Sequence, residues 1–73
     1  MASFKVMEKG FAIVRDKSGK MVKCMESDLD EQFFSTVFTF MDEVRAVSTS
    51  NIHCCEVWQY ASGDTLSLLA TFF

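Results

Sequence analysis

Apolar residues recur at steps of three and four positions between residues 28 and 47, the one segment with a sustained helical period. Asp28 is expected to cap this helix, with Glu31 three residues later completing a capping box. The polar run from Ser48 competes for backbone hydrogen bonds, so the helix is predicted to end at Val47. The apolar stripe consists of Leu29, Phe33, Val37, Phe40, Met41, Val44 and Val47.

The apolar arc of this helix is wider than one buried face needs, because it extends round to Phe34 and Phe38. One interpretation is that a broad sheet curls around the helix and buries both rings. The other is that the two rings, one turn apart and fringed by charge, face a partner protein. The second interpretation predicts a partner-binding site made of Glu31, Phe34, Phe38, Asp42 and Arg45.

Three strands are predicted before the helix, over residues 3–9, 11–16 and 20–26. Gly10 separates the first two, either as a tight turn or as a bulge in one long strand. The segment Lys17-Ser18-Gly19 fits a hairpin loop closed by Gly19 in the left-handed conformation. The first hairpin is therefore centred on Ser18.

The register of this hairpin is predicted to pair Val14 with Val22 and Ala12 with Cys24, a small apolar set suited to lie under the helix. The opposite face is also largely apolar, although antiparallel sheets usually leave one face polar. This suggests that the second face is covered. Its apolar members are Phe11, Ile13, Met21 and Met25.

A second hairpin is predicted after the helix, with strands over 52–60 and 64–73 joined by residues 61–63. Its predicted pairs are Trp58 with Leu66, Glu56 with Leu68, Cys54 with Ala70 and Ile52 with Phe72. The chain is thus predicted to be a single α+β domain over residues 1–73. Its order is β-β-β-α-β-β, an antiparallel sheet of four or five strands packed against one amphipathic helix.

The composition narrows the functional class. The chain has 73 residues, 49% of them hydrophobic, with eight Phe and no Pro, which excludes a disordered chain. A net charge of −3 argues against nucleic acid as a partner. No apolar run approaches the about 20 residues of a membrane span. Three Cys and no apolar signal segment after Met1 predict a reduced, cytoplasmic protein.

The cluster His53-Cys54-Cys55 is the one group of reactive side chains. Alternation along a strand sends Cys54 and Cys55 to opposite faces, so they cannot share a metal ion. His53 and Cys55 share a face, which Cys24 approaches across the sheet, and a thiol–imidazole pair is conceivable. Packing as small hydrophobic residues is the preferred interpretation of all three Cys.

Glu56 lies on a strand whose neighbouring positions are apolar. The preferred interpretation puts it on the solvent face, with Val57, Cys55 and Leu69 toward the core. The alternative, a half-buried carboxylate, requires a basic partner such as Arg45 or Lys23. A lone carboxylate does not by itself indicate acid–base catalysis.

The chain shows no catalytic pair, metal-ligand spacing or phosphate loop, so we expect no enzyme activity, metal or cofactor. The leading hypothesis is a small acidic inhibitor or adaptor that occupies a basic surface of another protein. Compact phage or mobile-element genes encode anti-defence and host-takeover factors of this kind. The alternatives are a homodimeric structural protein and a thiol-dependent enzyme. The homodimer would pair through its sheets or its helices. Two apolar sheet faces support it, and so does an edge strand that carries Leu68, Leu69, Phe72 and Phe73.

Overall fold

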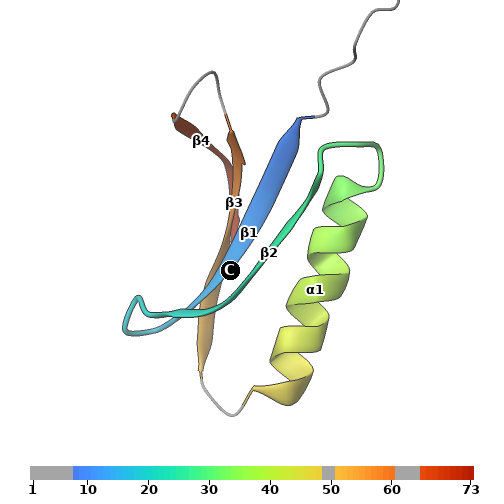
Figure 1. The fold of residues 1–73 in the computed structure, drawn as a ribbon. Coiled ribbons are helices and arrows are strands. Elements are labelled where there is room, and N and C mark those ends of the chain that lie inside the picture. Colours follow the sequence, from blue (N-terminus) through green and yellow to red (C-terminus); the bar gives the residue numbers. More distant parts are fainter. Residues whose placement is uncertain (1–7, 49–50, 61–64) are drawn as a thin grey trace, which may run out of the picture.

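The computed structural model of the chain describes residues 8–48, 51–60 and 65–73 (Figure 1). Its elements are β1 (Lys9–Asp16), β2 (Met21–Asp28), α1 (Phe33–Val47), β3 (Ile52–Tyr60) and β4 (Leu66–Phe72). The strands form one antiparallel sheet in the order β2-β1-β3-β4, and α1 lies against one face of it (Figure 1). The predicted α+β class, with a single helix on an antiparallel sheet, is confirmed.

The first strand runs through Gly10 without a turn, from Lys9 to Asp16. Gly10 pairs with Ser27 on one side and Gln59 on the other, so it is an ordinary ladder position. Most of the predicted strand over residues 3–9 lies outside the described residues. The order within the described part is therefore β-β-α-β-β.

The core lies between α1 and the sheet face that it covers. Ala12 and Val14 of β1 and Cys55 and Val57 of β3 alternate toward the helix, because every second strand residue points to the same face. The helix supplies the other side of the core from its stripe. Its buried residues are Phe33, Val37, Phe40, Met41 and Val44.

The helix begins four residues later than predicted, with its N-cap at Gln32 instead of Asp28. β2 continues to Asp28, whose carboxylate accepts a hydrogen bond from Lys9 instead of capping a helix. Gln32 is the N-cap residue, and its side chain makes no capping hydrogen bond. The backbone N–H of Gln32 donates a hydrogen bond to Asp30 Oδ1 at 2.9 Å. The predicted cap at Asp28 and capping box with Glu31 are wrong, because strand pairing with β1 takes up Asp28, and the N-cap position falls on Gln32. The predicted end at Val47 is confirmed.

The first hairpin turns as predicted but pairs in a different register. Gly19 has φ +86°, the left-handed conformation that the loop requires. Val14 nevertheless pairs with Lys23, because a β-bulge between Val14 and Arg15 leaves Val22 as an extra residue. One extra residue moves every following side chain of β2 to the other face.

This shift in register exchanges the faces of Cys24 and Met25 in β2. Ala12 pairs with Met25, which packs against the core, and Ile13 pairs with Cys24, which is exposed. The prediction that Val22 and Cys24 lie in the core is therefore wrong. The prediction that Met25 lies on the opposite face is also wrong. The predicted core positions Ala12 and Val14 are correct.

The second hairpin also differs from its predicted register. Trp58 pairs with Leu68 and Val57 with Ala70, which leaves Leu69 as a bulge residue with 39% of its surface exposed. The predicted inward position of Leu69 is thus wrong, and Ala70 and Phe72 pack against the core in its place. The predicted turn at residues 61–63 lies outside the described residues.

Gly10 allows the ring of Phe33 to lie directly against the backbone of β1. A Cβ atom at this position would stand 2.8 Å from Cζ of Phe33 and 3.0 Å from Cδ2 of Leu29. We expect Gly10→Ala to lower the free energy of unfolding by about 1–3 kcal/mol, because overpacking displaces a fully buried ring. Urea denaturation measures the change. In a Phe33→Leu background the same substitution should have little effect; an equal loss there would contradict the steric explanation.

Candidate functional site

An aromatic patch lies along one side of α1, where the helix meets β4. It consists of Phe34, Phe38 and Phe72. The ring of Phe72 stands edge-on to both helical rings, with centroids 5.0 Å from Phe38 and 6.4 Å from Phe34. Phe34 and Phe38 nevertheless keep 42% and 45% of their surfaces exposed. The sheet does not curl far enough around the helix to bury them.

The charged residues predicted around these rings are all exposed. Glu31 lies in the turn before α1, while Asp42 and Arg45 follow Phe38 by one and two turns on the helix. Among the ion pairs of the described residues, none involves Glu31, Asp42 or Arg45. Phe34, Phe38, Asp42 and Arg45 thus share one side of α1, and Glu31 lies in the turn that precedes it; the three charged residues are exposed.

Phe72 is the patch residue that sequence reasoning missed. The dimer hypothesis includes it as a residue of an edge strand, and the predicted register pairs it with Ile52. In the structure it pairs with Cys55 and reaches the helix from β4. Its position depends on the bulge at Leu69, and no local sequence signal marks that bulge.

The second apolar surface is the sheet face opposite α1, here called the outer sheet face. Side chains alternate with the core positions, so Phe11 and Ile13 of β1 and Trp58 and Tyr60 of β3 point to this face. No other described element lies on it (Figure 1). The rings of Phe11 and Tyr60 pack with centroids 5.3 Å apart, and Tyr60 is 45% exposed. The outer sheet face continues on β4 through Leu66 and Leu68, which are 44% and 51% exposed.

Glu56 lies on the outer sheet face in an ion pair with Arg15. Arg15 Nε donates to Glu56 Oε1 at 2.9 Å, and Arg15 Nη1 donates to the Gly19 carbonyl at 3.0 Å. The carboxylate faces away from Val57 and Cys55, as in the preferred interpretation of the sequence. It is nevertheless half-buried and forms an ion pair with Arg15. Its partner is Arg15, so the expected partners Arg45 and Lys23 are both wrong.

Trp58 carries the one buried side-chain polar atom without a hydrogen-bond partner among the described residues, its indole Nε1. A buried donor without an acceptor costs about 1–3 kcal/mol of stability. Its neighbours across the strands are Phe11 and Leu68, which offer no side-chain acceptor. Trp58 thus lies at the centre of an apolar strip across three strands.

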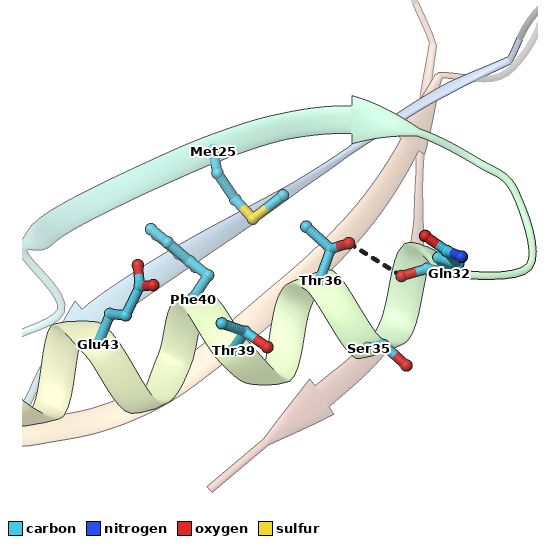
Figure 2. A pocket seen from close by; sticks show the side chains of 7 residues that line it. All are labelled: Met25, Gln32, Ser35, Thr36, Thr39, Phe40 and Glu43. Carbon is cyan, nitrogen blue, oxygen red and sulfur yellow. Dashed lines mark hydrogen bonds between the residues drawn. The ribbon is translucent and has the colours of Figure 1, made fainter.

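A groove of about 620 Å³ runs between β2 and the solvent-facing side of α1 (Figure 2). Met25 and Phe40 point toward each other across it, and Glu43 is the one titratable group in its lining. Thr36 Oγ1 donates back to the Gln32 carbonyl at 3.0 Å. One carboxylate without a second acid or base is a poor basis for acid–base chemistry. The remaining lining residues are Gln32, Ser35, Thr36 and Thr39.

The three cysteines are free and lie in three different environments. Cys55 belongs to the core, Cys54 is buried beside Arg15 on the outer sheet face, and exposed Cys24 is separated from both by β1. The predicted approach of Cys24 to Cys55 is therefore wrong. The His53 ring packs against Phe73, with centroids 5.4 Å apart. The described residues contain no group of three or more His, Cys, Asp or Glu side chains placed to hold a metal ion.

Burial raises the pKa of the Cys55 thiol to about 11, and negative charge on Cys54 acts in the same direction, while Arg45 opposes it. Because the thiolate is the nucleophile, this works against reaction at neutral pH. We expect iodoacetamide at pH 7 to alkylate Cys55 at least about 100-fold more slowly than Cys24, measured by peptide mass spectrometry. In denaturant the rates should converge. Equal rates in the folded protein would contradict the protection of Cys55, and a faster rate than that of Cys24 would show an activated thiol.

Comparison of the chain with known protein families, with curated proteins and with solved structures found no match. Among the described residues, no helix has the length and apolar character needed to cross a membrane. The functional argument therefore rests on the surfaces themselves.

Proposed function

We propose that this protein is a binding module that acts as an inhibitor or adaptor by occupying the surface of another protein. The observation that carries the proposal is the aromatic patch. Phe34 and Phe38 stay more than two-fifths exposed although each contacts Phe72, so they are held in place without being buried. Rigid, exposed aromatic rings are the side chains that most often supply binding energy at protein interfaces.

The charges beside the patch suit a basic partner. Glu31 and Asp42 flank the rings, and Arg45 is the one basic residue of α1. Exposed acids increase the rate of encounter with a positively charged surface, while the rings supply the energy of the bound state. Arg45 can pair with a carboxylate of the partner within the same contact. The proposed binding site is therefore Glu31, Phe34, Phe38, Asp42 and Arg45, together with Phe72.

We place this function in the cytoplasm. The cysteines of the described residues are free thiols, as expected in a reducing compartment. Binding, not catalysis, is proposed because Cys54 and Cys55 are buried and the groove between β2 and α1 offers a single carboxylate.

A homodimer without a separate ligand is the second candidate function. The observation that favours it is the outer sheet face, which carries large apolar side chains and is not covered by α1. The two candidates use different surfaces, so substitutions on one surface test one candidate at a time.

The experiment that tests the first proposal is capture with the tagged, full-length chain from lysate of the cells in which it naturally occurs. We expect a stoichiometric protein that binds the wild type and is lost with Phe34→Ala/Phe38→Ala. The matched control is Val47→Ala, also apolar and exposed on α1 but outside the patch, which should retain the partner. Loss of the partner with both variants, or with neither, contradicts binding through the patch.

A further inference from the structure

The outer sheet face is an apolar surface that no described element covers (Figure 1). It combines two half-buried residues of β1, Phe11 and Ile13, with Trp58 at its centre and exposed Tyr60. Antiparallel sheets packed on one side normally turn polar residues to the other. An outward face with aromatic and aliphatic side chains on three adjacent strands indicates a surface that packs against another surface. Its β4 members are Leu66 and Leu68.

The charges on this face already neutralise each other. Lys9 pairs with Asp28 at one end, and Arg15 pairs with Glu56 toward the other. Among the described residues of this face, Glu26 is the remaining charged one, on the edge strand β2 and near Lys9. A nearly neutral face carrying adjacent opposite charges is complementary to its own copy, because a two-fold axis can set Arg15 of one copy near Glu56 of the other. A strongly charged partner would gain little from it.

The size of the face is also close to what a pair of copies needs. Four strands about 4.8 Å apart, each seven or more residues long at about 3.3 Å per residue, span roughly 450 Å². Two copies bury roughly 900 Å² of flat area, and side chains raise the accessible area further. A specific interface needs about 1,000 Å² with good complementarity.

We propose that two copies of this chain pack their outer sheet faces together about a two-fold axis near Trp58. The product is a four-layer helix–sheet–sheet–helix dimer, with the sheets aligned as in a β-sandwich. This inference specifies the second candidate function and does not depend on the aromatic patch. It differs from pairing along the β4 edge, which would leave Trp58 and Phe11 uncovered.

The dimer leaves both aromatic patches open. α1 lies on the opposite side of the sheet from the interface, so the two copies carry their patches on the outside (Figure 1). A dimer of this form presents two identical binding sites. A partner with two matching sites is then held more tightly than by one copy, because the second contact is intramolecular.

The test is the oligomeric state of the full-length chain, measured by analytical ultracentrifugation at micromolar concentration. We expect a dimer for the wild type. Leu68→Glu introduces a charge on the exposed outer sheet face and should weaken dimerisation at least about tenfold. Val47→Glu places the same charge at the 77% exposed end of α1 and should leave the dimer intact. Leu66→Glu serves as a second interface variant if Leu68→Glu does not fold by circular dichroism.

Trp58 is the single tryptophan and reports on the interface directly. Its emission should shift to longer wavelength, and acrylamide quenching should rise, when the wild type is diluted until it dissociates. A protein that is a monomer at all concentrations overturns the proposal. This holds even if Trp58 emission indicates a shielded indole, because the shielding would then come from within one copy. A dimer that survives both interface variants, with Trp58 emission unchanged by dilution, assigns the contact to a sheet edge and also overturns it. Neither result affects capture through the aromatic patch.

Discussion

Replacing Phe33 with alanine is expected to lower the free energy of unfolding by about 3–5 kcal/mol. Phe33 is 1% exposed and is the largest fully buried side chain, closed in by Gly10 and Leu29. A domain of this length has a total stability of roughly 4–11 kcal/mol, so the variant should be largely unfolded or close to it. Urea denaturation followed by far-ultraviolet circular dichroism measures the change, at one protein concentration for all variants.

The neighbouring residue provides the control. Phe34 has the same side chain one position along the helix, but it is 42% exposed. Its ring makes edge-on contacts with the rings of Phe33 and Phe72. Phe34→Ala is expected to lower the free energy of unfolding by about 0.5–1.5 kcal/mol, the typical value of an aromatic pair. Similar losses for Phe33→Ala and Phe34→Ala would mean that the helix does not sit on the sheet with the face described above.

The second large effect is expected on binding. The double substitution Phe34→Ala/Phe38→Ala should weaken association with the captured partner by roughly 2 kcal/mol or more, at least about 30-fold in Kd. Both rings offer about half of their surface to a partner while Phe72 holds them edge-on. Isothermal titration calorimetry with the purified partner measures the affinity of each variant.

The same variant must remain folded for this result to count. Its free energy of unfolding should fall by about 1–3 kcal/mol, because two aromatic pairs with Phe72 are lost. Asp42→Asn should preserve folding, slow association and reduce its dependence on salt, since an exposed acid acts mainly on the encounter. If the double variant binds like the wild type, the aromatic patch is not the interface.

Local features of the sequence determined the elements and the main turn. The three- and four-residue period predicts a helix because it places apolar residues on one side, and the buried face of α1 is this stripe from Phe33 to Val44. Gly19 is left-handed as predicted, since glycine adopts that conformation with little strain. The exposure of Phe34 and Phe38 was an open alternative, because the width of an apolar arc does not say how far a sheet reaches.

Only the tertiary structure decided where the helix begins and which residues face each other across the strands. Asp28 is a good cap by type, but pairing of β2 with β1 holds it in a strand beside Lys9. The bulges at Val22 and Leu69 are decided by how the strands meet, and no local pattern encodes them. Because side chains alternate along a strand, one extra residue changes which ones enter the core. That alternation placed Met25 under the helix and brought Phe72 to the aromatic patch, through contacts between segments far apart in the chain.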